Sequence, residues 1–345
     1  MLPAPIILVG KTLGELENLL LTWGEPRYRG EQIAHWLYGQ IVDDVGSMSN
    51  IPGILRTRLA EETVLHPARV ETVRHSVDGT RKYLLSLGDE ALIETVYIPE
   101  ISRTTVCIST QVGCGMGCTF CATGLGGLTR NLTSGEIVDQ ILQVALDVGA
   151  LPSNVVFMGM GEPLANYEQL LKAIAIINAP WGLDIGIRHL TISTCGVVPG
   201  IRRLGKEGLG LTLAVSLHAA DDEKRSQIMP INNIYSIGEL MGSLQGYVKD
   251  TSRRVTIEYA LMADFNDSMA DARNLVGLLE GLLCHVNLIP INPVQGGPHT
   301  KPRDSQVEKF LGALKRSGLA VSIRKERGQD IAAACGQLRG QWEAE

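Results

Sequence analysis

Stretches typical of buried β-strands alternate with helical stretches along most of the chain from residue 104 onward. Such alternation is typical of parallel β/α units, in which helices cover a parallel sheet. The candidate strands are residues 104–109, 154–159, 189–194, 211–217, 254–262 and 285–291, followed by a last strand at 320–325. Six strands before that last one, rather than eight, predict an α/β fold with a partial (β/α)6 barrel instead of a closed one.

Two regions of different character precede the alternating part. Apolar residues recur at helical spacing within residues 12–65, which predicts a helical region. Residues 69–98 contain three β-rich runs separated by Asp-Gly and Gly-Asp pairs, which predict a three-stranded antiparallel meander. We therefore expect a helical domain at 1–68, a linking meander at 69–99, the barrel at 100–295 and a C-terminal extension at 296–345.

Composition and charge limit the classes of protein that the chain can belong to. Apolar residues make up 45% and charged residues 20%, as in globular domains. There is no run of about 18 apolar residues, and the first residues lack the features of a signal peptide, so we expect a cytoplasmic protein that does not enter membranes. The net charge of −6 does not indicate nucleic-acid binding. Any RNA-binding face must be local, and the more basic residues 296–345 are the better candidate.

Polar or glycine-rich segments follow most of the predicted strands. A cysteine cluster follows the first strand, and the segments after the others are Gly159–Pro163, Thr194–Gly196, His218 and Asn292. In β/α barrels the active residues lie on loops at the carboxyl ends of the strands. We therefore expect these segments to share one rim of the barrel.

Cys114, Cys118 and Cys121 form a C-x3-C-x2-C motif. Thiolates are soft ligands that suit zinc or the iron of an iron–sulfur cluster. Three of them can hold three irons of a cubane and leave the fourth iron open, whereas structural zinc normally takes four protein ligands. The sequence has no second cysteine pair, so zinc would need Cys107 or a histidine. The motif therefore favours an iron–sulfur cluster over zinc.

Several separated motifs resemble those of the RlmN/Cfr family of radical S-adenosylmethionine (SAM) RNA adenine methyltransferases. In chain order they are QVGCGMGCTFCATG, MGMGEPL, ISTCGVVPGI, VSLHA, the INP around Asn292, and RGQDIAAACGQL. The resemblance extends from the helical N-terminus to near residue 340. It implies a radical SAM barrel, a [4Fe–4S] cluster, SAM as both methyl donor and radical source, and RNA as the substrate.

The resemblance also implies a reaction. Adenine C2 is electron-poor and has no acidic hydrogen, so a radical route suits its methylation. In the family, a cysteine near the C-terminus carries a methyl group that is activated by a SAM-derived radical and added to the base, and a second cysteine resolves the adduct through a disulfide. The C2-specific branch implies adenine 2503 of 23S rRNA and adenine 37 of tRNA as substrates. It also implies a monomer and an electron donor such as flavodoxin.

Matching the motifs position by position implies roles for individual residues. The cluster ligands are Cys114, Cys118 and Cys121, the methyl carrier is Cys335, the resolving cysteine is Cys107 and the proton acceptor is Glu94. The residues that would contact SAM are Gly161, Glu162, Ser193, Ser216, Leu217, His218 and Asn292. A carboxylate at Glu162 would face the SAM ammonium group, which makes electrostatic sense.

Some of these residues also have a purely structural interpretation. Cys107 lies in a predicted strand and Cys335 follows three alanines, as small buried residues often do; the family resemblance favours a functional role for both. Cys195 and Cys284 match no functional position, and we interpret them as structural.

Two groups of basic residues are ambiguous. Arg130 and Asn131 could contact phosphate, but Thr133 and Glu136 form a capping-box pattern that favours a helix cap. The helical N-terminal region resembles an RNA-binding accessory domain, although its acidic balance also fits a simple solvated bundle; its candidate RNA-binding residues are Arg27, Arg29, Arg56 and Arg58.

Three alternatives stay open. The first is a C8-specific enzyme of the same family, because the two branches share these motifs. The second is a radical SAM enzyme of another reaction class, which would have no need of the Cys107 and Cys335 pair. The third is a zinc-binding RNA protein that does not cleave SAM.

Overall fold

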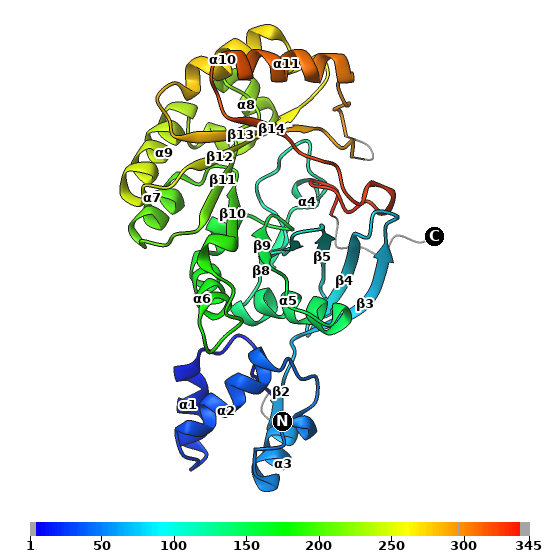
Figure 1. Cartoon of the computed structure of the whole chain (residues 1–345), viewed down its shortest axis with the longest axis vertical. Coiled ribbons are helices and arrows are strands. Elements are labelled where there is room, and N and C mark those ends of the chain that lie inside the picture. The colour runs from blue at the N-terminus through cyan, green and yellow to red at the C-terminus, as the bar shows by residue number, and fades with distance from the viewer. Residues whose placement is uncertain (1–4, 295–296, 339–345) are drawn as a thin grey trace.

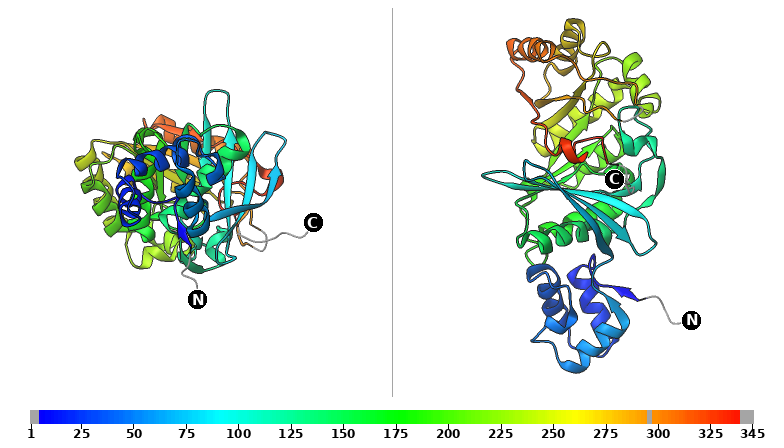
Figure 2. Two further views of the ribbon diagram at one scale, coloured as in Figure 1. Left: turned by 90° about the horizontal axis from the view of Figure 1, so that it is seen from below. Right: turned by 90° about the vertical axis from the view of Figure 1, so that its right-hand side faces the viewer.

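The structure is a computed structural model, and it describes residues 5–294 and 297–338. The helical N-terminal region lies at one end of the long axis, and the sheet with its helices forms the rest of the molecule (Figures 1 and 2). The outer ends of the predicted helical domain and C-terminal extension, and the junction near residue 295, lie outside the described residues. The boundaries between the four predicted regions stay predictions.

One ten-stranded sheet organises the molecule, in the order β14-β13-β12-β11-β10-β9-β6-β5-β4-β3. Its parallel part confirms the predicted α/β fold, with every predicted strand present and β14 adding to the first six. These strands are β6 (Thr104–Cys107), β9 (Asn154–Phe157), β10 (Leu190–Thr194), β11 (Thr212–Ser216), β12 (Val255–Leu261), β13 (Cys284–Pro290) and β14 (Val321–Ile323).

The predicted meander is also present, but it is not a separate unit. It consists of β3 (Ala68–His75), β4 (Arg81–Leu87) and β5 (Leu92–Pro99), and β5 pairs antiparallel with β6 so that Val96 lies opposite Cys107. The sequence pattern did not predict that the meander would extend the barrel sheet. This extension places β5 beside the loop that follows β6.

Helices cover the parallel part of the sheet (Figure 1). They are α5 (Ser134–Val148), α6 (Tyr167–Asn178), α7 (Val198–Lys206), α8 (Asp222–Ile228), α9 (Ile237–Thr251), α10 (Met269–Leu279) and α11 (Asp304–Arg316), with single turns of 3-10 helix at Pro163–Asn166, Ile187–His189, Pro230–Asn233 and Gln329–Ile331. The capping box predicted for α5 is confirmed, because Thr133 and Glu136 bond each other reciprocally. Arg130 supports this cap with hydrogen bonds to Glu136 and to Asp89.

The N-terminal region contains the expected helices. They are α1 (Leu13–Thr22), α2 (Tyr28–Ala34), which continues into a π-helical turn at His35–Gly39, and α3 (Gly53–Glu62), with a 3-10 turn at Val45–Ser47. A short parallel pair, β1 (Ile6–Ile7) with β2 (Thr63–Val64), was not predicted. Gly10 packs directly on α5, because a Cβ there would lie 2.2 Å from the Cα of Gly135.

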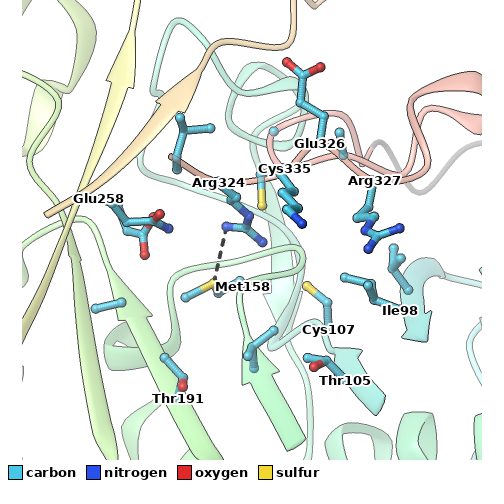
Figure 3. Close-up of a pocket in the computed structure, with 18 of the residues that line it drawn as sticks. Ile98, Thr105, Cys107, Met158, Thr191, Glu258, Arg324, Glu326, Arg327 and Cys335 are labelled. Atoms are coloured by element: carbon cyan, nitrogen blue, oxygen red, sulfur yellow. Dashed lines mark hydrogen bonds between the residues drawn. The ribbon is translucent and has the colours of Figure 1, made fainter. Parts of the chain in front are cut away.

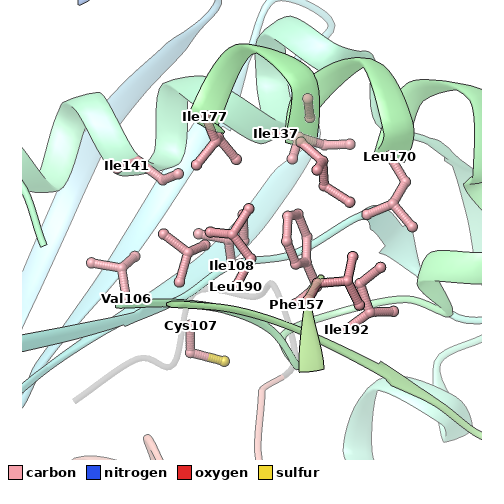
Figure 4. Close-up of a cluster of buried hydrophobic side chains, with 14 of the residues drawn as sticks. Val106, Cys107, Ile108, Ile137, Ile141, Phe157, Leu170, Ile177, Leu190 and Ile192 are labelled. Atoms are coloured by element: carbon pink, nitrogen blue, oxygen red, sulfur yellow. The ribbon is translucent and has the colours of Figure 1, made fainter. Parts of the chain in front are cut away.

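The core between the sheet and α5 and α6 consists of aliphatic and aromatic side chains. Figure 4 shows Val106 and Ile108 pointing toward these helices while Cys107 points to the opposite face of the sheet. This follows from the two-residue period of a strand. One face of the sheet therefore packs the helices and the other is left for the site.

We expect Ile141→Ala to lower the free energy of unfolding by about 2–5 kcal/mol, because the Ile141 side chain is fully buried on α5 and its removal leaves a cavity. Chemical denaturation would measure the change. Leu146→Ala on the same helix is the matched control, because Leu146 is 39% exposed and should change stability little. Equal losses in the two variants would contradict the packing described for α5.

No helix in the described part of the chain is both long and apolar enough to cross a membrane.

Candidate active site

The three motif cysteines lie on a loop between β7 (Gln111–Gly113) and α4 (Ala122–Leu125). Strand β7 pairs with β8 (Leu128–Asn131), and the amide of Cys114 donates to the carbonyl of Gly127 at 2.7 Å. Gly113 has a φ of +75°, and a Cβ there would lie 2.0 Å from the Gly127 oxygen, so only glycine fits. The loop is therefore held in a fixed, sharply turned conformation.

The three thiols suit a cluster better than a single ion. Burial raises the pKa of each thiol, to about 11 for Cys114, and neighbouring cysteines raise it further. Such thiols become thiolates when a metal binds them. Cysteine thiolates are the protein ligands of iron–sulfur clusters, so this donor set fits the iron–sulfur prediction.

A cavity of about 170 Å³ opens above this loop at the carboxyl ends of the strands. The three cysteines line it together with most of the residues predicted to contact SAM, which are Gly161, Glu162, Ser193, Ser216, His218 and Asn292. Leu217 does not line the cavity; its side chain is buried in the core. Cys195, which we interpreted as structural from the sequence, lines the same cavity.

Glu162 is a buried carboxylate at the end of the loop that follows β9. It accepts hydrogen bonds from the amides of Leu164, at 3.0 Å, and Cys195, at 2.8 Å. Burial raises the pKa of Glu162, and these amide bonds oppose that rise. A carboxylate offers about four lone-pair positions. Glu162 can therefore also accept hydrogen bonds from a cationic ammonium group.

His218 is held as a neutral imidazole. Its Nδ1 accepts a hydrogen bond from the amide of Ala260 at 2.9 Å, and its ring meets Phe120 edge-on at 4.7 Å. Burial, with a smaller contribution from the charge of Arg225, lowers the pKa of His218 to about 3. The remaining proton is then on Nε2, which is a hydrogen-bond donor.

A larger cavity of about 690 Å³ adjoins the first, and Figure 3 shows residues that line it. Cys107 lines it from β6, and Cys335 lines both cavities. All the cysteines have free thiols. Cys335 therefore lies near both Cys107 and the loop that carries Cys114, Cys118 and Cys121, called the cluster loop below, and its charge raises the pKa of Cys107 and of Cys121. The disulfide implied by the resemblance stays a prediction.

The segment carrying Cys335 is bound at several points. The Gly336 carbonyl accepts from the Ala122 amide at 2.7 Å, and the Leu338 carbonyl accepts from the Thr123 hydroxyl at 2.6 Å. On the other side, Asp330 accepts a hydrogen bond from the Ser76 hydroxyl at 2.6 Å. Cys335 is therefore held against the cluster loop by backbone contacts.

Glu94 lies on β5, one strand from Cys107. It forms an ion pair with Lys82 at 3.0 Å, and both side chains are almost fully buried. Glu94 lies two residues from Val96, which pairs with Cys107, so the two side chains project from the same face of the sheet. Glu94 is not among the residues that line either cavity.

Sequence reasoning missed Arg324 and Glu258. Both line the two cavities, and the Arg324 guanidinium lies between Glu258, Met158 and the two cysteines (Figure 3). Cys335, with Glu258 and Cys107, raises the pKa of Arg324. One signal was available: Glu258 is an acidic residue inside a predicted buried strand.

The four N-terminal arginines all have partners within their own region. Arg27 pairs with Glu17, Arg58 pairs with Glu62, Arg29 bonds Gln32 and Arg56 bonds the carbonyl of Gly46. Their proposed contact with RNA stays a prediction.

The fold and the cysteine loop define the class of the protein. A model of the radical SAM superfamily matches residues 108–276. A radical SAM methyltransferase from Sphaerobacter thermophilus has a similar crystal structure, with a TM-score of 0.95, 46% identity, and coverage of 98% of this chain and 100% of that one. The chain is a radical SAM enzyme.

Further comparisons identify the family. A model of the ribosomal RNA large subunit methyltransferase N-terminal domain matches residues 6–65. The probable dual-specificity RNA methyltransferase RlmN of Symbiobacterium thermophilum is 48% identical over 336 residues, or 96% of this chain and 91% of that protein. The protein of the same description from Pelotomaculum thermopropionicum is 49% identical over 332 residues, or 95% and 90%. The chain belongs to the RlmN family of radical SAM RNA methyltransferases, and its cofactors are a [4Fe–4S] cluster and SAM.

Proposed function

We propose that this chain methylates C2 of adenosine in RNA, at adenine 2503 of 23S rRNA and adenine 37 of tRNA. One observation carries the proposal: Cys107 and Cys335 line one cavity, and Cys335 also lines the cavity of the cluster loop. A radical SAM enzyme that only abstracts hydrogen needs no such pair. The RlmN-named relatives support the choice of RNA and its dual targets.

The larger cavity suits a nucleotide in size and charge. Its volume of about 690 Å³ lies within the usual range for ligand sites. Its charged lining residues are Arg103, Arg324, Lys325 and Arg327 against Glu100, Glu258 and Glu326. The chain as a whole is acidic, but this lining has one more cation than it has acids, which supports local binding of a polyanion.

The smaller cavity, together with the adjoining part of the larger one that Asn292 and Cys335 also line, would bind SAM. When bound, the cluster and SAM supply the radical chemistry and the methyl group. Glu162 would accept hydrogen bonds from the SAM ammonium group, and the neutral His218 would donate from Nε2 without adding charge. Gly161 has a φ of +103°, and a Cβ there would lie 2.6 Å from the Cβ of Gln111, so the chain needs glycine at this position of the cavity wall.

Cys335 would carry the methyl group and become linked through it to adenine C2. Forming this link replaces the hydrogen on C2: Glu94 would accept the proton, and the one electron that must leave with it would be taken up by the redox chemistry that the cluster supplies. The thiolate of Cys107 would then attack the Cys335 sulfur, so that a sulfur–sulfur bond forms as the sulfur–carbon bond breaks. The released carbon takes up a proton and becomes the new methyl group.

The protein would act in the cytoplasm as a monomer, with a small electron-transfer protein such as flavodoxin as its reductant. Cluster reduction requires a source of single electrons, which supports the last point.

The test is methylation of RNA by anaerobically reconstituted protein that holds about four irons per chain, as this cluster type requires. Mass spectrometry of nuclease fragments from 23S rRNA and tRNA should show 2-methyladenosine at the two adenines. Finding 8-methyladenosine would instead support the C8-specific alternative. One zinc per chain and no SAM cleavage would refute the radical mechanism altogether.

A further inference from the structure

Arg225 on α8 is a buried arginine that lies behind the rim of the SAM cavity. It is 1% exposed. Its Nη2 donates to the carbonyls of Cys195, at 2.6 Å, and Ser216, at 3.2 Å, and its Nε donates to the carbonyl of Leu217 at 3.1 Å. Nη1 donates to Oδ1 of Asn232 at 2.9 Å. One guanidinium thus joins the segments that follow β10 and β11 to the turn that follows α8.

The segments that Arg225 joins carry the proposed SAM contacts. Ser216 and His218 line the cavity, and the amide of Cys195 holds Glu162 in place. Gly196 lies directly beside the guanidinium, and a side chain there would crowd it, because a Cβ would lie 3.2 Å from Nη2 of Arg225. His218 has a left-handed backbone with a φ of +58°, which a fixed neighbour must stabilise.

The same helix also contacts the cluster loop. The amide of Thr119, between two of the cluster cysteines, donates to the carbonyl of Ile228 at the end of α8, at 3.0 Å. Cys118 packs in an apolar group with Ile228 and Met229. A change at Arg225 therefore reaches both the SAM rim and the cluster loop.

The charge of Arg225 lies close to the cluster loop. Its Nη2 donates to the carbonyl of Cys195, and Cys195 packs in the same apolar group as Cys118. All four hydrogen-bond acceptors of the guanidinium are neutral. The nearby carboxylate of Asp222, which accepts from the Asn232 amide, partly offsets the lowering of the Arg225 pKa by burial. A buried cation costs free energy unless nearby anions compensate it. Thiolates that hold a cluster would add to the negative charge that Asp222 supplies.

We propose that Arg225 is a positioning residue with two effects: it fixes the rim that binds SAM, and its buried positive charge raises the reduction potential of the cluster. The first effect rests on the SAM contacts proposed above. The second follows from Coulomb's law, because reduction adds negative charge to the cluster and a fixed cation in a low-dielectric interior stabilises the added charge.

Two variants separate the charge from the hydrogen bonds. Arg225→Gln removes the charge, so the midpoint potential of the cluster should fall. At the midpoint potential of the unmodified protein, the ratio of reduced to oxidised cluster in this variant should be about tenfold lower, which corresponds to about 59 mV for a one-electron couple. Arg225→Lys keeps the charge, so its midpoint should stay near that of the unmodified protein. Neither the amide of glutamine nor the single ammonium group of lysine can bond the three carbonyls as the planar guanidinium does. Both variants should therefore bind SAM at least about tenfold more weakly than the unmodified protein.

The measurements are redox titration followed by electron paramagnetic resonance, and SAM binding by equilibrium dialysis, on protein with its full iron content. Arg203→Gln is the control, because Arg203 is exposed on α7 and pairs with Glu168. The role of the charge would be overturned if the midpoint potential of Arg225→Gln were unchanged. It would also be overturned if the midpoint potential of Arg225→Lys were as low as that expected for Arg225→Gln. Unchanged SAM affinity in Arg225→Lys would overturn the positioning role. No RNA is used, so failure of RNA methylation is scored separately.

Discussion

Cys335→Ala is expected to abolish RNA methylation, with a loss of about 10³-fold or more, as when a covalent catalytic residue is removed. The physical reason is that no other described thiol lies at the junction of the two cavities and outside the cluster loop. Cys107 lines only the larger cavity, and Cys195 lines only the smaller one. The measurement is transfer of radiolabelled methyl from SAM to a 23S rRNA fragment.

The same variant should keep its cluster and its affinity for SAM. The cluster ligands and Glu162 are on other segments, and Cys335 is held by the backbone of Gly336 and not by its own thiol. Cys284→Ala is the matched control, because Cys284 is a buried cysteine on β13 that lines neither cavity. If Cys335→Ala methylated RNA at a rate close to that of this control, the carrier assignment would be wrong.

Most of the barrel could be predicted from sequence because its signals are local. Central parallel strands such as β12 are buried runs of apolar and β-branched residues, and the α5 cap is encoded within four residues. The pairing of β5 with β6 was missed because it depends on contacts between segments, which no periodicity records. The β1–β2 pair was missed because two-residue strands carry no pattern.

The candidate site was predictable to a different extent. The cluster loop has a dense motif, and polar residues after the strands converge because parallel strands end on one rim. Arg324 and Arg225 could not be found in this way. Arg324 lines the cavity because the C-terminal segment passes back over the sheet. Arg225 bonds four acceptors that lie on three separate segments. These are tertiary contacts, and a charged residue on a short helix gives no sign of them.

Cys107→Ala is expected to trap the RNA on the protein. Without the Cys107 thiol, the bond between Cys335 and the base cannot be exchanged for a disulfide, so the adduct should accumulate to a large fraction of the protein while free methylated RNA falls by about 10²-fold or more. The measurement is a denaturing gel of protein with labelled RNA, in which the adduct migrates above either component. Cys284→Ala should give no such band.

The lifetime of the adduct in the unmodified protein should also depend on pH. Burial, together with charge on Cys335, raises the pKa of Cys107 to about 12, and Arg324 opposes the rise. The attacking species is the thiolate. Below that pKa, each unit of pH increases the thiolate fraction about tenfold, so adduct decay should accelerate from pH 7 to pH 9. Once Cys335 is alkylated it carries no charge, so its contribution to the raised pKa of Cys107 disappears. Burial then still raises that pKa, while Arg324 and a backbone hydrogen bond from Met158 lower it. Arg324→Gln should therefore raise the pKa of Cys107 and slow the decay of the adduct at any given pH. A decay rate that depends on neither pH nor Arg324 would show that Cys107 is not the group that resolves the adduct.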